Sequence, residues 1–86
     1  MRYTIVISES AFKQLVRLPI TAAKKVQNTI DALSENPRPS GVKKLKGAKE
    51  DFYRVRVGDY RIIYAIDDAV KIVDVRKIGN RKDIYR

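Results

Sequence analysis

The segment DFYRVRVGDYRIIYAI, residues 51–66, largely alternates apolar and polar side chains on both sides of a central Gly-Asp pair. Because successive side chains of a strand point to opposite faces of a sheet, this alternation predicts a β-hairpin of strands 51–57 and 60–66. A two-residue turn at Gly-Asp places Arg56 directly opposite Arg61. A slip of one residue would turn the apolar side chains away from the core, so this register is strongly specified.

The predicted hairpin has an apolar face and a basic face. The apolar face, which we expect to be core covered by helices, consists of Tyr53, Val55, Val57, Tyr60, Ile62 and Tyr64. The basic face holds Arg54, Arg56 and Arg61. The like charges of Arg56 and Arg61 destabilise a cross-strand pair, and an anion between their guanidinium groups would offset that cost. Because guanidinium groups match the geometry of phosphate, the pattern favours a phosphate-binding face.

The Asp-Asp pair at 67–68 predicts a second two-residue turn, before a strand over 70–76. This turn would place Asp74 opposite Arg61, where the carboxylate holds the guanidinium group. Arg76 would join the same basic face. The alternative is an ordinary solvated face, on which Arg61 and Asp74 form an exposed ion pair that contributes little to stability.

Periodicity and helix-breaking residues define the other elements. They are a strand over 2–7, helices over 8–18 and 20–36, a loop over 37–50, and a tail over 77–86 with a Gly-Asn turn and a last helical turn. Ser8 is a favourable N-cap, Pro19 separates the helices, and Asn36-Pro37 stops the second one. We therefore expect a single α+β domain over 1–86, with an antiparallel sheet of about four strands and a helical hairpin packed on one face.

Both predicted helices carry an apolar stripe, which we interpret as core without chemistry. The residues at helical spacing are Phe12, Leu15 and Val16 in the first helix, and Ala22, Ala23, Val26, Ile30 and Leu33 in the second. The two stripes are expected to cover the apolar face of the hairpin.

A strong positive charge indicates a polyanionic partner. The chain has 19 Lys and Arg against 10 Asp and Glu, a net charge of +9 and a pI of about 10.0. The four lysines of the 37–50 loop, which are Lys43, Lys44, Lys46 and Lys49, are expected to contact the backbone of such a polyanion. Because there is no cysteine, no signal-peptide h-region and no apolar run of membrane-spanning length, we expect a cytoplasmic protein without membrane contact.

The absence of histidine and cysteine narrows the possible chemistry. It excludes two-histidine ribonuclease chemistry, histidine-containing triads, thiol catalysis and most zinc sites. The carboxylates do not suggest a two-metal cluster and no nucleotide-binding glycine motif occurs, so no metal or cofactor is expected. One metal-free reaction suits clustered arginines, namely attack of an RNA 2′-hydroxyl on the adjacent phosphate. Guanidinium groups stay protonated, so the proton carriers would be Tyr85 or the lysines at 43, 44 and 46.

Several motifs together resemble one family. KKLKG followed by DFYRVRVGDYRIIYAI, and then VRKIGNRKDIY, is similar to the RelE/ParE superfamily of bacterial and archaeal toxins of type II toxin–antitoxin systems, most of all to its RelE branch. Each motif is loose by itself, but their order and spacing span the whole chain. The resemblance implies an α/β fold and a ribosome-dependent, metal-independent endoribonuclease that cuts mRNA in the ribosomal A site and inhibits translation.

The resemblance also implies which residues act. Its cleavage site corresponds to Arg54, Arg56, Arg61, Arg81 and Tyr85 in this sequence. By this analogy Arg61 and Arg81 stabilise charge on the scissile phosphate, and Arg56 binds phosphate. Tyr85 stacks on a base or positions the 2′-hydroxyl. The sequence departs from well-known RelE toxins, which have lysines at the positions of Arg54 and Arg56, so the general base and general acid are open.

Two other functions remain alternatives. A ParE-like inhibitor of DNA gyrase would share the fold without the Arg81 and Tyr85 site, although the ending IGNRKDIYR argues against it. A non-catalytic RNA- or ribosome-binding module would also use a basic face. The partners implied by the resemblance are a cognate antitoxin, the ribosome and mRNA, and a basic toxin suits an acidic wrapping chain.

Overall fold

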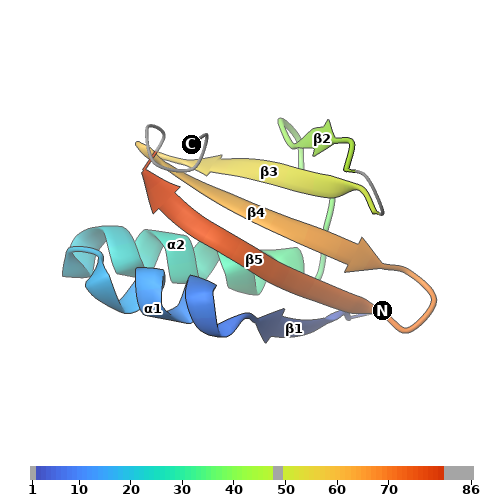
Figure 1. The fold of residues 1–86 in the computed structure, drawn as a ribbon, viewed down its shortest axis with the longest axis horizontal. Helices are drawn as coiled ribbons and strands as arrows, with labels where there is room; N and C mark the ends of the chain where they lie inside the picture. Colours follow the sequence, from blue (N-terminus) through green and yellow to red (C-terminus); the bar gives the residue numbers. More distant parts are fainter. Residues whose placement is uncertain (1, 48–49, 81–86) are drawn as a thin grey trace.

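In the part of the chain that the structure describes, five strands form one sheet, and two helices pack on the same side of it (Figure 1). The computed structural model describes residues 2–47 and 50–80. Its elements are β1 (Thr4–Ile7), α1 (Glu9–Arg17), α2 (Ile20–Leu33), β2 (Lys43–Leu45), β3 (Phe52–Val57), β4 (Tyr60–Asp67) and β5 (Ile72–Asn80). The strand order is β1-β5-β4-β3-β2, and β1 runs parallel to β5 while the other neighbours are antiparallel. The expected α+β class with a covering helical hairpin is confirmed, with β2 as an additional short strand inside the predicted 37–50 loop. The prediction of a wholly antiparallel sheet was wrong for the first strand, because β1 runs parallel to β5.

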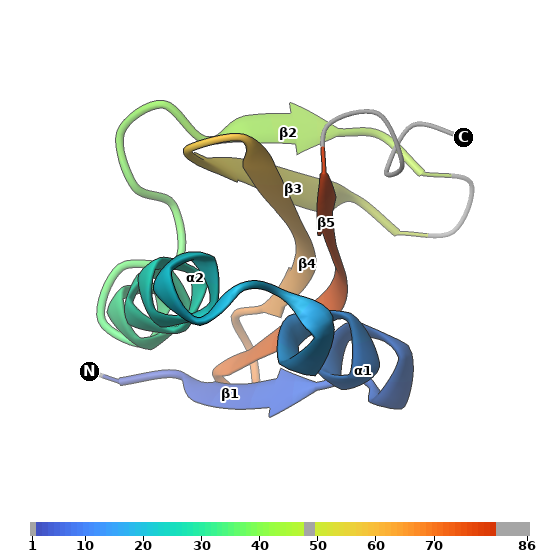
Figure 2. The same cartoon turned by 90° about the vertical axis from the view of Figure 1, so that its left-hand side faces the viewer.

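Both helices begin where local chemistry predicts. Ser8 caps α1, because its Oγ accepts a hydrogen bond from the Ala11 N–H at 3.1 Å and donates one to the Arg76 carbonyl at 3.1 Å. Pro19 precedes α2, and its carbonyl accepts the first helical hydrogen bond, from Ala23. The second helix ends at Leu33, earlier than the predicted boundary at residue 36. Figure 2 shows the two helices in front of the curved sheet.

The core lies between the helices and one face of the sheet. Its buried apolar residues are Ala11, Leu15, Val26, Ile30, Leu33, Tyr53, Val55, Ile62, Tyr64, Val73, Val75 and Ile78. The prediction that Phe12 and Val16 belong to the core was wrong, because these side chains are 53 % and 63 % exposed. Ala11 occupies the core position of that helix face instead, where a small side chain lets α1 approach β5 closely.

The register of the β3–β4 hairpin agrees with the prediction. Arg56 pairs with Arg61 and Tyr53 with Tyr64 across the turn at Gly58. The rings of Tyr53 and Tyr64 stack with their centroids 5.9 Å apart. The Tyr64 hydroxyl donates to the Pro37 carbonyl at 2.7 Å, and burial raises the pKa of this phenol. The apolar face of the hairpin is therefore core, as expected.

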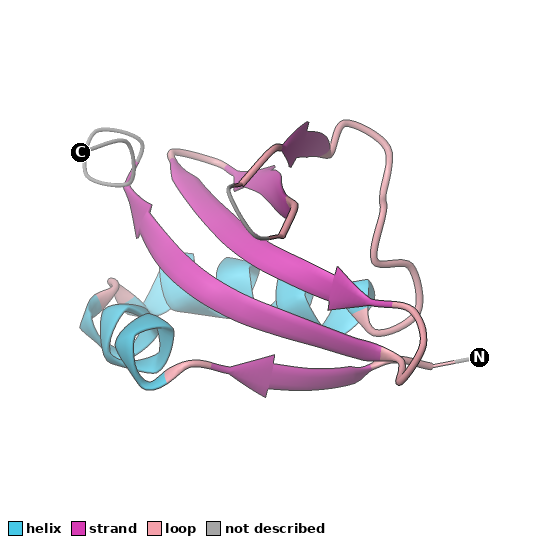
Figure 3. Ribbon diagram, turned by 45° about the vertical axis from the view of Figure 1, so that its right-hand side comes forward, coloured by secondary structure: helices cyan, strands magenta, loops and turns pink. Residues whose placement is uncertain are grey.

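The connection between β4 and β5 differs from the prediction. It is not a two-residue turn, because Asp67 pairs with Ile72 and residues 68–71 form the loop (Figure 3). The Asp67 carboxylate accepts hydrogen bonds from the N–H groups of Ala69 and Val70 at 3.0 and 3.2 Å. Lys71 closes the loop with a positive φ of 57°. An aspartate that caps its own loop in this way stabilises a longer turn than the two-residue form.

The longer loop overturns the predicted pairing of Arg61 with Asp74. Asp74 stands opposite Ala65, and Arg61 stands opposite Gly79. The strand also continues to Asn80, so the predicted Gly-Asn turn at 79–80 was wrong. The predicted last helical turn lies outside the described residues.

The loop between β4 and β5 is tied to two other segments. Asp68 accepts hydrogen bonds from the Tyr3 hydroxyl at 2.5 Å and from the Arg38 guanidinium group at 2.9 and 3.2 Å. The bond from Arg38 is the main cause that lowers the pKa of Asp68 to about 2. Arg38 also lies over the Tyr53 ring at 5.2 Å. These contacts anchor the segment that leads from α2 to β2.

Among the described residues, none of the helices has the length and apolar composition needed to cross a membrane.

Candidate nucleic-acid interface

The sheet face that points away from the helices carries cations in two rows that cross neighbouring strands. The pairing aligns Lys43, Arg54, Ile63 and Lys77 in one row, and Arg56, Arg61 and Gly79 in the next. Neighbouring strands lie about 4.8 Å apart, so side chains in a row stand side by side. We call the five cations of these rows the basic face: Lys43, Arg54, Arg56, Arg61 and Lys77. The grouping of the three arginines agrees with the sequence prediction.

The three arginines of the basic face differ in exposure. Arg56 is exposed, Arg54 is half-buried, and Arg61 is only 4 % exposed. The Arg61 guanidinium group donates to the Tyr60 carbonyl at 3.2 Å. A buried guanidinium group in a fixed position is preorganised for an anion, because little reorganisation is needed when the anion arrives. An exposed one contributes attraction that salt screens more strongly.

A pocket opens at the edge of the basic face. It has a cavity volume of about 320 Å³ and is lined by Ser40, Gly41, Lys43, Arg54, Val55 and Arg56. Three of these side chains are cationic, and the pocket lies between β3 and the segment leading into β2. Its chemistry suits a phosphate or a ribose rather than an apolar ligand.

A β-bulge in β5 brings Lys77 to the basic face. Val75 pairs with Tyr64 while Lys77 pairs with Ile63, so Arg76 is an extra residue between them. Strict alternation from the buried Val73 and Val75 would have turned Lys77 toward the core. With the bulge, Ile78 is buried instead and Lys77 is exposed. Sequence reasoning missed Lys77, although two polar residues between Val75 and Ile78 are the pattern that indicates such a bulge.

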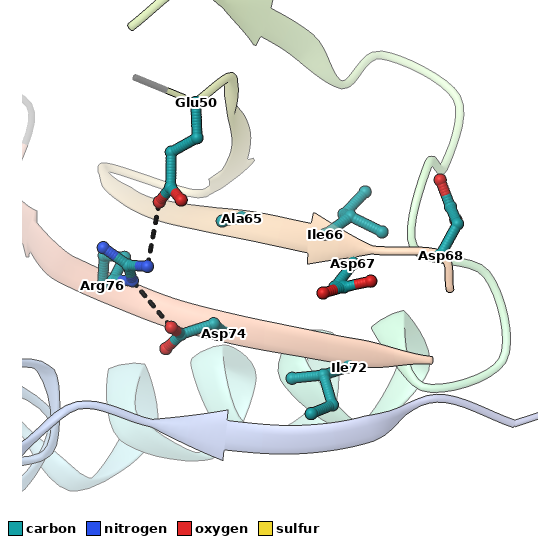
Figure 4. A pocket seen from close by; sticks show the side chains of 8 residues that line it. All are labelled: Glu50, Ala65, Ile66, Asp67, Asp68, Ile72, Asp74 and Arg76. Atoms are coloured by element: carbon teal, nitrogen blue, oxygen red, sulfur yellow. Dashed lines mark hydrogen bonds and ion pairs between the residues drawn. The ribbon is translucent and has the colours of Figure 1, made fainter. Parts of the chain in front are cut away.

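The other end of the same face is acidic. A pocket of about 400 Å³ is lined by Glu50, Ala65, Ile66, Asp67, Asp68, Ile72, Asp74 and Arg76 (Figure 4). Arg76 lies between two carboxylates, with Nε 2.8 Å from Asp74 Oδ2 and Nη2 2.9 Å from Glu50 Oε1. The open face is therefore basic at one end and acidic at the other, which gives a bound polyanion a preferred position.

The remaining predicted site residues lie elsewhere. Arg76 reaches the open face as expected, but Asp74 and Glu50 hold it. Lys44 pairs with Tyr53 in the row next to that of Lys43, on the opposite side of β2, and its ammonium group is 3.2 Å from the Asp51 carboxylate. Lys46 is exposed just beyond β2.

Arg81 and Tyr85 lie outside the described residues. In the described part of the chain, the acidic residues form no group that could hold a metal ion.

Comparison with known proteins identifies the family. The family described as ParE toxin of type II toxin–antitoxin system, parDE, matches residues 5–85. The toxin RelE of Mycobacterium tuberculosis is 38 % identical over 85 residues, which cover 98 % of this chain and 87 % of the relative. Toxin RelG of the same organism is 35 % identical over 88 residues, covering 100 % of this chain and 99 % of the relative. The chain belongs to the RelE/ParE superfamily of type II toxins.

Structural comparison agrees with this assignment of the toxin. The crystal structure of the archaeal RelE–RelB complex from Pyrococcus horikoshii contains a chain that matches with a TM-score of 0.84 and 32 % identity. The match covers 96 % of this chain and 99 % of that chain. The resemblance noted in the sequence is thereby confirmed, as is the α+β fold with two helices on one side of the sheet.

Proposed function

We propose that this toxin is a ribosome-dependent endoribonuclease that cleaves mRNA without a metal ion. The observation that carries the proposal is the gathering of Arg54, Arg56 and Arg61 on one open sheet face beside a cationic pocket. RNA phosphates are the ligands that best match several guanidinium groups on neighbouring strands. The likeness to the relatives named toxin RelE and toxin RelG supports a ribonuclease rather than a gyrase inhibitor.

In the proposed reaction the 2′-oxygen attacks the adjacent phosphorus atom, and the bond from phosphorus to the 5′-oxygen breaks. The products are a 2′,3′-cyclic phosphate and a free 5′-hydroxyl. Arg61, held in place by burial, stabilises the negative charge that builds on the phosphoryl oxygens. Arg56 binds the same phosphate, while Arg54 and Lys43 bind a neighbouring one in the pocket. By analogy with the family, Arg81 assists Arg61 and Tyr85 positions the 2′-hydroxyl.

A cognate antitoxin is the proposed protein partner. The Pyrococcus structure is that of a RelE–RelB complex, and we extend that assembly to this toxin. A chain with a net charge of +9 favours an acidic partner that covers the basic face. Because the ribosome and mRNA are the proposed targets, we place the activity in the cytoplasm.

Ribosomes programmed with a defined mRNA provide the test of cleavage. We expect the purified toxin to cut within the A-site codon, with ends mapped by primer extension. Arg56→Gln should slow cutting by about 10²-fold, the usual effect of losing one donor to a reacting phosphate or oxyanion. Arg81→Ala and Tyr85→Ala should also lose activity. Lys24→Gln, which removes an exposed charge from α2, is the matched control and should cut at the wild-type rate.

Two outcomes would contradict the proposal. Intact mRNA together with DNA-damage signalling in cells that express the toxin would indicate a ParE-like gyrase inhibitor. Stalled translation with uncut mRNA would indicate a non-catalytic ribosome-binding module. Full activity of both Arg81→Ala and Tyr85→Ala would refute the site assigned to those residues.

A further inference from the structure

The proposed cleavage needs a proton at the leaving 5′-oxygen. The three arginines of the basic face are poor sources of that proton, because guanidinium groups hold their protons firmly. The chain contains no histidine. A lysine ammonium group gives up a proton more readily, so the lysines near Arg61 are the groups to consider.

Lys77 is the lysine that the sheet register places next to Arg61. It stands opposite Ile63, the second residue after Arg61 on β4, so Lys77 and Arg61 are diagonal neighbours. Diagonal neighbours across antiparallel strands lie about 7–8 Å apart, within reach of long side chains. Lys43 is on the basic face too, but β3 separates its strand from β4, which puts it roughly 10 Å from the strand of Arg61.

Among the described residues, Gly79 leaves room on the basic face next to Lys77 and Arg61. Gly79 stands directly opposite Arg61, and a Cβ atom added there would meet no described atom within 4 Å. An RNA backbone lying over Gly79 would therefore be next to Arg61, which is across on β4, and to Lys77, which is two residues earlier on β5.

The cation that precedes Lys77 in β5 is engaged by carboxylates. Arg76 is bound to Asp74 and Glu50. Lys77 is exposed and forms no ion pair with any residue in the described ranges 2–47 and 50–80. Its ammonium group is thus available to a substrate.

We propose that Lys77 is the general acid of the reaction, an inference that rests on the proposed ribonuclease function. As the bond from phosphorus to the 5′-oxygen breaks, its electron pair goes to that oxygen, which takes a proton from the Lys77 ammonium group. The proton of the attacking 2′-hydroxyl passes to solvent water. The neutral Lys77 amine then regains a proton from water, so the cycle has no net change in protons. Lys77 can thereby donate the proton that Arg54 and Arg56 donate only poorly.

A sulfur substitution in the RNA tests this role directly. The substrate is a ribosome-bound mRNA in which the bridging 5′-oxygen at the cleavage site is replaced by sulfur, compared with the normal mRNA in single-turnover experiments. A thiolate leaves without needing a proton. We expect Lys77→Ala and Lys77→Arg to slow cleavage of the normal mRNA by about 10²- to 10³-fold. Both variants should cleave the sulfur-containing mRNA at the wild-type rate.

Controls separate this role from charge and folding. Lys24→Ala removes the same charge from the helical layer and should leave both rates unchanged. Lys77→Arg keeps the charge and serves if Lys77→Ala folds poorly, as judged by thermal unfolding. Equal losses on both mRNAs, or no loss on the normal one, would overturn the role of Lys77. If the wild-type toxin cut neither mRNA, the ribonuclease function itself would fail, and this inference would fall with it.

Discussion

Gly79 shows how a single position can serve the site without contacting the core. It lies in β5 opposite the buried Arg61, and no atom of the described residues lies within 4 Å of a Cβ atom placed there. The residue has no positive φ, since among the described glycines only Gly41 and Gly58 do. Its backbone therefore does not require glycine, and the absence of a side chain leaves room on the basic face.

At this position we predict that a substitution can lower activity without lowering stability. Gly79→Val should keep or slightly raise the melting temperature, because a β-branched residue suits a strand better than glycine does. Cleavage of ribosome-bound mRNA should fall strongly, because the new side chain occupies the space above the strand. Thermal unfolding and the cleavage assay measure the two effects.

Thr4→Val, an exposed substitution on β1, is the matched control for the added apolar surface. Normal cleavage by Gly79→Val would show that RNA does not pass over this part of the sheet.

At the scale of the element, the bulge in β5 reconciles two demands on one strand. The core needs both Val75 and Ile78, and the basic face receives Lys77 between them. Regular alternation cannot bury two residues that are three apart in sequence. The extra residue, Arg76, lets both Val75 and Ile78 face the core. Its side chain forms ion pairs with Asp74 and Glu50 at the acidic end of the face.

Deleting single residues from β5 tests this explanation. Removing Arg76 leaves Val75 opposite Tyr64 and Lys77 opposite Ile63 in a regular strand. The free energy of unfolding should fall by about 1–2 kcal/mol, because two partly exposed ion pairs and the hydrogen bond from the Ser8 hydroxyl to the Arg76 carbonyl are lost. Removing Val75 instead would bring Arg76 into the core opposite Tyr64, at a cost of roughly 3–5 kcal/mol.

Urea unfolding of the two deletion variants makes the comparison. Removal of Arg76 could lower the free energy of unfolding as much as removal of Val75 does. The bulge would then be needed for the shape of the sheet, and not only for directing each side chain of β5 to the correct face.

At the scale of the whole molecule, charge is distributed so that one face is suited to a polyanion. The net charge is +9, and the basic face collects cations from four neighbouring strands, while the carboxylates of the acidic pocket lie at the other end of the sheet. Phosphate binding by such a face releases counterions, which makes affinity fall as salt rises.

We therefore predict a measurable salt dependence of ribosome binding. The logarithm of the affinity should fall linearly with the logarithm of the salt concentration. Arg56→Gln should reduce the steepness of that line by about 0.7, the loss of one phosphate contact on a single strand. Lys24→Gln, on the helical layer, should leave it unchanged. Equilibrium binding at several salt concentrations measures both slopes, and a flat response of the wild-type toxin would rule out phosphate-dominated docking.

The sequence alone predicted the features that short-range chemistry controls. The tight turn between β3 and β4 and the alternation around it set the register, so the grouping of Arg54, Arg56 and Arg61 followed. The cap at Ser8 is local in the same sense. In each case the deciding contacts join residues close together in the chain, so the sequence pattern predicts them without knowledge of the rest of the fold.

Only the tertiary structure decided the features that depend on packing between distant segments. The loop after Asp67 shifted β5 along β4 and separated Asp74 from Arg61, and the bulge at Arg76 exposed Lys77. The burial of Arg61 likewise could not be read from its neighbours in sequence. A turn, a bulge and a buried charge each change the free energy of folding by a small amount compared with the packing of the whole core. Their final form therefore depends on how the sheet and helices pack together.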